Sequence, residues 1–328
     1  MLDRRTLAVG ALALFVVMSQ AESGRSQGQG GQRQGAGAPQ GGGGAGRGGR
    51  GSAFTPADGA KDLKSVLFNW TWRMGMLRSG NESELIKTLD YHAESGTIQV
   101  NGQPCALTKY RVQINYQIPG YRTQIECTLP NKQTYKNVET MSGDYAWDED
   151  IPGAELVAGK GKATPRPASL EERRIRLWAS PHGAAKAAIA GAAGLSVSES
   201  FGQNPAALLD RQATAGAKAT TTMSWQGDKA VITYPIPGVP GATATATLNK
   251  YLPERVVVTK GTDTTEFVYG NFDDWNNPLF KIEALYAGTI VERRNGTVVR
   301  DVKTKVTEIG QVYVVVPVPD SVQKAGRK

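Results

Sequence analysis

The chain of 328 residues has few of the side chains that usually build catalytic or metal centres. It contains two cysteines and only two histidines, His92 and His182. A Cys/His nucleophile or a zinc site therefore has little to draw on, and we expect a capping or surface role for His182. The motif H-E-x-x-H is also absent, G-x-G-x-x-G does not occur before a helix, and the match to G-x-S-x-G at residues 24–28 lies in a Gly/Gln/Arg-rich segment rather than after a predicted strand. These absences predict no catalytic residue and no cofactor, and they favour a non-enzymatic protein.

The sequence also lacks a hydrophobic run long enough to cross a bilayer. Its longest run, Leu7–Met18, has twelve residues, whereas a spanning helix needs roughly 18 or more. Arg4 and Arg5 precede the run, and Ser19 and Ala21 follow it at the small-residue positions that a signal peptidase selects. We therefore expect residues 1–21 to be a signal peptide. The mature chain would be periplasmic or secreted, with no transmembrane segment.

Branched apolar and aromatic side chains are missing from residues 22–52, which are mostly Gly, Gln, Ala and Arg. Such a segment cannot bury enough surface to offset its ordering entropy, so we expect a disordered Gly/Gln/Arg-rich linker. The signal carries +1 and the linker +3 of the total charge of +8, which leaves +4 for the rest. This diffuse charge on an exported chain does not favour a nucleic-acid partner.

Residues 53–328 are long enough for one α+β domain with a large core. Its first element should be a helix, because the residues Leu63, Val66, Leu67, Trp70, Met74 and Leu77 form one apolar stripe. A β-hairpin should follow, turning at Pro119-Gly120. This turn places Ile114 opposite Ile125 and Val112 opposite Cys127 on one apolar face, while the other face is polar.

The same register bears on the candidate disulfide between Cys105 and Cys127. Exported cysteines pair by default. The predicted register, however, puts Cys105 opposite residue 134, which lies roughly 23 Å along the strand from Cys127. A disulfide needs Cα atoms within about 7 Å. We therefore expect the bridge only if the chain folds back between Asn101 and Lys109.

Two helices are predicted in the middle of the chain. Ser169 and Glu172 have the spacing of a capping box, and Ser180 and Pro181 open a second helix that ends before Gly194. Strands return from Met223 onward, with a turn at Asn295-Gly296 and a last strand at Val312–Val316. Strands, helices and further strands without βαβ alternation predict a strongly curved, mainly antiparallel sheet, a half-barrel, packed on a few helices.

An acidic cluster is the strongest candidate for chemistry. Asp144, Asp148, Glu149 and Asp150 surround Trp147 and could bind a metal ion or act as acid and base. The cluster lacks the spacing of a calcium loop, and acidic residues before a Pro-Gly turn are usually solvated. We expect no metal site, with Asp148, Glu149 and Asp150 as the weak candidates.

The C-terminal part carries a resemblance to a known family. It includes Phe267–Trp275 (FVYGNFDDW), Arg294-Asn295-Gly296 between two strands, and Tyr313–Pro319 (YVVVPVP). These segments resemble uncharacterised secreted bacterial proteins similar in layout to the lipoprotein-carrier (LolA/LolB-like) superfamily. The resemblance implies an unclosed, curved sheet around helices, with apolar space between them that receives acyl chains.

Three functional hypotheses follow. The first is an exported envelope protein, not an enzyme, that binds an apolar or amphiphilic ligand under the sheet; its partner would be a lipid or a lipid-modified protein. The second is a structural or interaction module of the cell envelope, in which the protein's own helices fill the sheet and the partner is another envelope protein. The third is a hydrolase of envelope polymer that uses the acidic cluster.

Overall fold

We describe residues 54–77, 86–216, 218–275, 284–310 and 313–326 of a computed structural model. The chain divides into two units, Met1–Arg50 and Gly51–Lys328, and all described residues belong to the second. The predicted signal peptide, 1–21, and linker, 22–52, lie outside them. No helix within the described ranges is long and apolar enough to cross a membrane.

The described residues form thirteen strands and six α-helices. The helices are α1 (Leu63–Arg73), α2 (Leu170–Ala179), α3 (Pro181–Ala193), α4 (Val197–Ser200), α5 (Pro205–Ala215) and α6 (Asp320–Gly326). The strands are β1 (Thr88–Val100), β2 (Gln103–Asn115), β3 (Gly120–Thr128), β4 (Thr134–Ser142), β5 (Tyr145–Glu149), β6 (Ala163–Pro165), β7 (Thr222–Gln226), β8 (Lys229–Pro235), β9 (Ala242–Asn249), β10 (Leu252–Lys260), β11 (Asp263–Asp274), β12 (Leu285–Arg294) and β13 (Thr297–Ile309).

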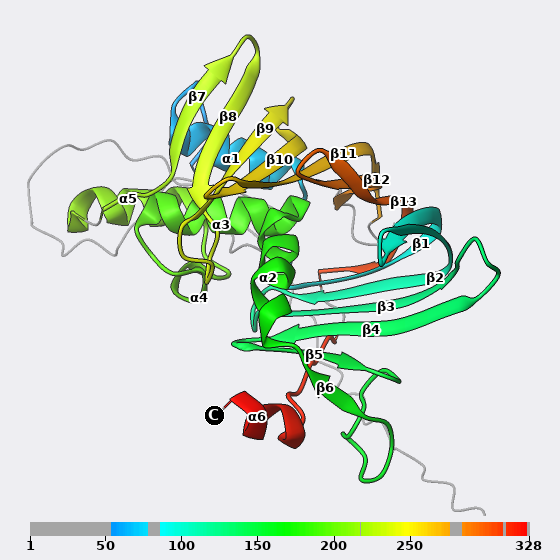
Figure 1. The fold of residues 1–328 in the computed structure, drawn as a ribbon. Helices are drawn as coiled ribbons and strands as arrows, with labels where there is room; N and C mark the ends of the chain where they lie inside the picture. Colours follow the sequence, from blue (N-terminus) through cyan, green and yellow to red (C-terminus); the bar gives the residue numbers. More distant parts are fainter. Residues whose placement is uncertain (1–53, 78–85, 217, 276–283, 311–312, 327–328) are drawn as a thin grey trace, which may run out of the picture. The chain divides into compact units, whose positions relative to one another are not determined.

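All thirteen strands belong to one antiparallel sheet. Their order is β6-β5-β4-β3-β2-β1-β13-β12-β11-β10-β9-β8-β7, so two meanders meet where β1 pairs with β13. Helices α2 to α5 lie between the meanders in the sequence (Figure 1). The predicted α+β class with an antiparallel sheet packed on helices is confirmed.

The predicted half-barrel is wrong in its degree of curvature. The sheet is open, with β6 and β7 as its edge strands, and it is not strongly curled. It bends enough for α2 to contact β4 in one meander and β10 in the other. Helix α3 contacts β8 and both neighbouring helices, α2 and α4. The helices occupy this face of the sheet, so its edges cannot approach one another.

Helix α3 forms the centre of the core because its side chains are small. All thirteen of its residues are buried. The Ser180 side chain accepts a hydrogen bond from the Gly183 amide, Pro181 occupies the first turn, and Gly194 ends the helix at φ +66°. These predicted caps are confirmed. A Cβ atom on Gly183 would lie 2.1 Å from the Leu177 carbonyl oxygen, so only glycine permits the close junction between α2 and α3.

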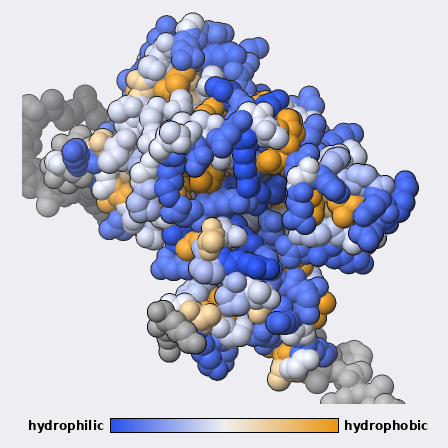
Figure 2. Space-filling view, in the orientation of Figure 1, coloured by the Kyte–Doolittle hydropathy of each residue, from blue (hydrophilic) through white to orange (hydrophobic). Residues whose placement is uncertain are grey.

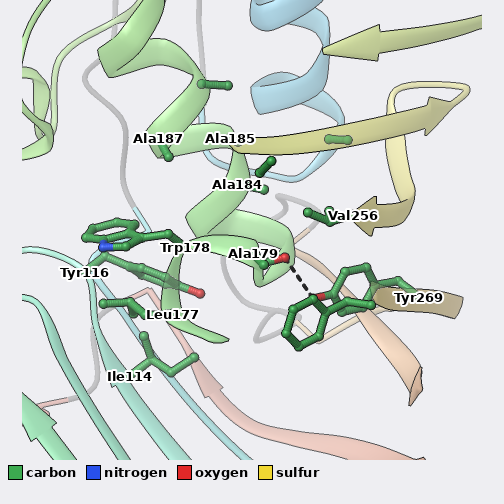
Figure 3. Packing of buried hydrophobic residues seen from close by; sticks show 14 of the residues in the cluster. Ile114, Tyr116, Leu177, Trp178, Ala179, Ala184, Ala185, Ala187, Val256 and Tyr269 are labelled. Atoms are coloured by element: carbon green, nitrogen blue, oxygen red, sulfur yellow. Dashed lines mark hydrogen bonds between the residues drawn. The ribbon is translucent and has the colours of Figure 1, made fainter. Parts of the chain in front are cut away.

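Large side chains fill the space around this junction. Figure 3 shows Leu177 and Trp178 at the end of α2 beside Ile114 and Tyr116 of the first meander, and the rings of Tyr116 and Trp178 are 6.4 Å apart. The Tyr269 hydroxyl, from the second meander, donates a hydrogen bond of 2.8 Å to the Ala179 carbonyl oxygen. The junction between α2 and α3 thus contacts both meanders. The visible surface in Figure 2 is mainly hydrophilic, with hydrophobic residues in small separate groups.

The predicted hairpin exists between β2 and β3, but its predicted register is wrong. Ile114 pairs with Tyr121, and Ile125 with Tyr110. The Asn115 side chain accepts hydrogen bonds of 2.9 Å from the amides of Gln117 and Ile118, which turns the chain before Pro119. The register is therefore shifted by four residues. Because this number is even, the predicted apolar face still points to the core.

The register shift accounts for the disulfide. A bulge between Leu107 and Lys109 adds to the register shift. The shift and the bulge together bring the Cα atoms of Cys105 and Cys127 within 5.5 Å of each other, and the two residues form a disulfide. Both cysteines are fully buried. The expected separation of roughly 23 Å along the strand is wrong because it was derived from the wrong register.

Other expectations also need correction. The Ser169 side chain caps no helix, because a short 3-10 turn precedes α2. A capping box forms instead at Ser196 and Glu199, at the start of α4. Tyr313–Val316 is not a strand, and residue 312 lies outside the described ranges. This segment lies against the predicted polar face of the hairpin: the side-chain Nδ2 of Asn115 donates a hydrogen bond of 2.9 Å to the Val314 carbonyl oxygen.

Candidate ligand cavity beneath the sheet

A cavity of about 540 Å³ opens between helix α2 and the strands of both meanders. Its apolar wall includes Ile98 of β1, Ile125 of β3 and Val299 of β13. Its charged wall consists of Glu139, Glu172, Arg176, Arg294 and Arg300. The cavity therefore has one side suited to an apolar group and another suited to a charged or strongly polar one.

Helix α2 supplies two of the charged side chains from one face. Glu172 and Arg176 are four residues apart, so they lie on adjacent turns, and their side chains form an ion pair of 2.8 Å. Arg173 points elsewhere: it donates to the carbonyl oxygens of Thr140 and Trp147, at 2.7 and 2.6 Å. Because Arg173 fixes the helix to β4 and β5, the face with Glu172 and Arg176 is held toward the cavity.

A buried carboxylate, Glu292, connects the arginines beneath this wall. It lies on β12 directly opposite Arg300 of β13, and its side chain is 1% exposed. Arg176 Nε donates to its Oε2 at 3.1 Å. Arg294 Nε and Nη2 donate to its Oε1 at 3.1 and 2.9 Å. Glu292 therefore accepts from two arginines and also faces a third, Arg300, at 3.6 Å.

The two outer carboxylates complete the network. Arg176 Nη1 donates to Glu139 at 3.0 Å. Arg294 Nη1 donates to Glu172 at 2.9 Å, and its Nη2 donates to the other oxygen of the same carboxylate at 2.5 Å. The two hydrogen bonds from Arg294 to Glu172 are bidentate, a geometry that strengthens a charge-assisted pair. Glu139 and Glu172 are more exposed than Glu292, with side chains 21% and 39% exposed, so they form the rim of the network.

The pKa values follow from this arrangement. Burial alone would raise the pKa of Glu292, but Arg176, Arg300 and Arg294 together lower it to about 2. Burial likewise opposes the charge on Arg176, yet Glu292, Glu172 and Glu139 hold its pKa well above the usual range. These groups stay charged at neutral pH, which does not suit them for general acid–base catalysis.

A second, smaller chamber of about 20 Å³ lies deeper in the core. It shares Arg176 and Arg300 with the larger cavity, and its wall includes Tyr121, Tyr269 and Tyr286. Its volume is enough for about one water molecule. Arg176 and Arg300 therefore lie between a large outer cavity and a small inner chamber.

His182 lies in the core and not on the surface, so the expected surface role is wrong. It is fully buried within α3, and its ring stacks on Tyr286 at 5.7 Å. Burial, and then the charge of Lys186, lowers the pKa of His182 to about 3. The imidazole is consequently neutral at physiological pH. Its Nε2 lies 3.4 Å from the Met74 carbonyl oxygen, which gives it a packing role between helices.

The members of the acidic cluster bind separate partners. Asp148 accepts from Arg166 at 2.7 Å and from Arg173 at 2.6 Å. Asp150 accepts from the Lys162 amide at 2.7 Å. Asp144, mostly exposed, pairs with Arg174.

Glu149 is buried and accepts from Trp147 Nε1 at 2.8 Å and from the Gly153 amide at 2.7 Å. Among the residues that the structure describes, no group of three or more His, Cys, Asp or Glu side chains could hold a metal ion. Glu149 and Asp150 anchor the segment between β5 and β6, whereas Asp144 and Asp148 pair with arginines of α2, and no observation favours the hydrolase hypothesis.

The charged wall of the cavity was not predicted from the sequence. A signal for it exists in the alternation of the strands. Glu292 follows Ile290 at a spacing of two, and Arg300 precedes Val302 at the same spacing, so both charges share the face of buried apolar residues. A charged residue on the apolar face of each of two paired strands predicts a buried ion pair.

The comparisons with known proteins are sparse. No family model matches the chain, and no curated protein matches it. Among solved structures, the chain is similar to a LolA superfamily protein from Nitrosomonas europaea. The identity is 11%, the match covers 78% of this chain and 96% of the other, and the TM-score is 0.34. A match at this TM-score carries no argument about family or ligand. The function is therefore inferred from the residues of this chain.

Proposed function

We propose that this protein is a non-enzymatic envelope protein that binds an amphiphilic ligand, a lipid or the acyl chain of a lipid-modified partner, in the cavity beneath the sheet. The proposal rests on the cavity, because one of its walls is apolar and another is charged. Its volume of about 540 Å³ falls within the range of about 300–1,000 Å³ that is typical of ligand sites. Arg176 on its charged wall and the buried Glu292 behind it stay ionised at neutral pH and suit binding better than proton transfer.

Two features support a location outside the cytoplasm. The N-terminal sequence has the order of a signal peptide, with Arg4 and Arg5 before the apolar run Leu7–Met18. The buried disulfide between Cys105 and Cys127 is typical of an oxidising compartment. Both features support the proposed periplasmic or secreted localisation.

Ligand extraction and uptake test the proposal. Purified protein would be analysed by mass spectrometry for co-purified lipid, then delipidated and titrated with a fluorescent fatty acid. We expect bound lipid or saturable uptake. An empty protein that takes up no fatty acid would refute the proposal.

A matched pair of variants locates the site. Val299 lines the cavity, whereas its neighbour Val298 is 39% exposed and does not line it. Val299→Trp should fill the cavity and weaken uptake at least tenfold, while Val298→Trp should leave uptake unchanged. Thermal melting of both variants would verify that they fold. Equal uptake by both would place the ligand elsewhere.

The second candidate is an interaction module whose sheet is filled by its own helices. The complete burial of α3 favours it, since this helix occupies the space under β8. In that case Val299→Trp should raise the thermal midpoint by filling an otherwise unused cavity, and no amphiphile should alter the midpoint of the natural protein.

A further inference from the structure

Arg300 is the least neutralised charge in the cavity wall. Its side chain is 8% exposed, and the residue lines both the large cavity and the small inner chamber. Its Nη1 donates to the hydroxyl of Tyr110 and, at 3.5 Å, to that of Tyr121. Within the described part of the chain, its Nε has no hydrogen-bond partner. The guanidinium thus meets neutral hydroxyl groups where a buried arginine usually meets a carboxylate.

The other two arginines differ from Arg300 in this respect. Arg176 contacts three carboxylates and Arg294 contacts two, each at 3.1 Å or less. Among the described residues, Glu292 is the one carboxylate that pairs with Arg300, at 3.6 Å, and its oxygens already accept from the other two arginines. In the deepest part of the network, the buried carboxylate of Glu292 therefore faces two buried guanidinium groups, those of Arg176 and Arg300.

A buried charge without an adequate counter-charge is costly. An anion in the cavity beside Arg300 would supply that counter-charge. The tyrosine hydroxyls would add donors, because an oxygen that accepts from arginine can still donate its own proton. Burial raises the pKa of Tyr110 well above its usual range, so this hydroxyl keeps its proton.

We propose that the amphiphile carries an anionic head group, a carboxylate or a phosphate, and that this group binds Arg300 and the adjacent tyrosine hydroxyls. This inference rests on the proposed function. The apolar part of the ligand would then lie along Ile98, Ile125 and Val299, which share the cavity with Arg300.

Calorimetric titration of delipidated protein with three ligands of equal chain length tests this inference. The ligands are decanoate, monodecyl phosphate and the neutral control decanol. We expect at least one of the two anions to bind ten times more tightly than decanol or better, since hydrogen bonds between charged groups exceed neutral ones by about that factor. Whether the carboxylate or the phosphate binds more tightly identifies the head group.

Variants then assign the preference to Arg300. Arg300→Gln should reduce anion affinity to that of decanol and leave decanol binding within about twofold, whereas Arg300→Lys should retain part of the preference. Arg293→Gln is the matched control, because Arg293 pairs with Glu266 outside the cavity. Should Arg300→Gln fail to fold, Tyr121→Phe removes one hydroxyl and should still weaken anion binding more than decanol binding.

The outcomes separate the two proposals. Equal affinity of the natural protein for all three ligands would overturn the anionic head group and leave amphiphile binding intact. Failure to bind any of the three would overturn the proposed function itself. A preference for anions that persists unchanged in Arg300→Gln would refute the role of Arg300.

Discussion

Replacing Glu292 with glutamine should destabilise the protein in a pH-dependent manner. Glu292 is fully buried and faces Arg176, Arg294 and Arg300. Glutamine has nearly the same shape, so the substitution removes the charge and little of the packing. Removing one partner from a buried ion pair leaves an uncompensated charge and typically costs about 3–5 kcal/mol.

The magnitude can be worked from the pKa of Glu292. Its pKa falls from the ordinary value of 4.5 to about 2 in the folded protein, which corresponds to about 3 kcal/mol of folding free energy. A lowered carboxyl pKa stabilises the fold above the unfolded value and loses that effect as pH falls through the folded value. The contribution of Glu292 is therefore complete at pH 7, falls to less than half by pH 3 and disappears below about pH 2.

Urea denaturation at pH 7, 5 and 3 measures this effect. The free energy of unfolding of Glu292→Gln should lie about 3 kcal/mol below that of the natural protein at pH 7, and the gap should narrow toward pH 3. Glu94→Gln serves as control, because Glu94 is exposed on β1 with Lys303 at 3.3 Å, and it should change stability by less than about 1 kcal/mol. A glutamine variant as stable as the natural protein, or a gap that does not change with pH, would refute the reasoning.

Three further predictions concern the sheet. Replacing Cys105 and Cys127 with alanine opens a link across 22 residues and should cost about 3 kcal/mol, which denaturation with and without reductant would reveal. Gly96→Ala should destabilise by several times more than Gly102→Ala in the same assay, since a Cβ atom at Gly96 would meet a backbone oxygen at 2.4 Å while one at Gly102 meets nothing within 4 Å. Ile114→Val should cost about 0.5–1.5 kcal/mol, whereas Ile114→Lys, at a position 1% exposed, should yield no cooperative melting transition.

Local sequence patterns correctly predicted those helices and turns whose defining residues lie within a few positions of one another. The apolar stripe of α1 and the caps of α3 depend on neighbouring turns of one helix, and both are present. The turn at Asn295-Gly296 is confirmed as well, with both residues at positive φ, as a tight hairpin requires. For such elements, the side chains that decide the structure are adjacent in the sequence.

The hairpin register could not be obtained in the same way. Alternation fixes which side chains face the core but is unchanged by a shift of two or four residues. The observed register depends on the Asn115 side chain, which accepts from two following amides, and Pro-Gly is an equally familiar turn signal. The disulfide between Cys105 and Cys127 was disfavoured for the same reason, because its geometry depends on that register and on the bulge beside Leu107.

The ligand cavity needs information that local patterns do not contain. Glu172 and Arg176 reach it from α2, while Glu292 and Arg300 come from strands more than a hundred residues later. Each of these residues, taken alone, is a common charged residue with no motif around it. They come together because the chain leaves the first meander, forms α2 to α5 and returns to pair β13 with β1. This closure buries the charges together, and a buried charge that its neighbours do not neutralise is the feature that points to a ligand.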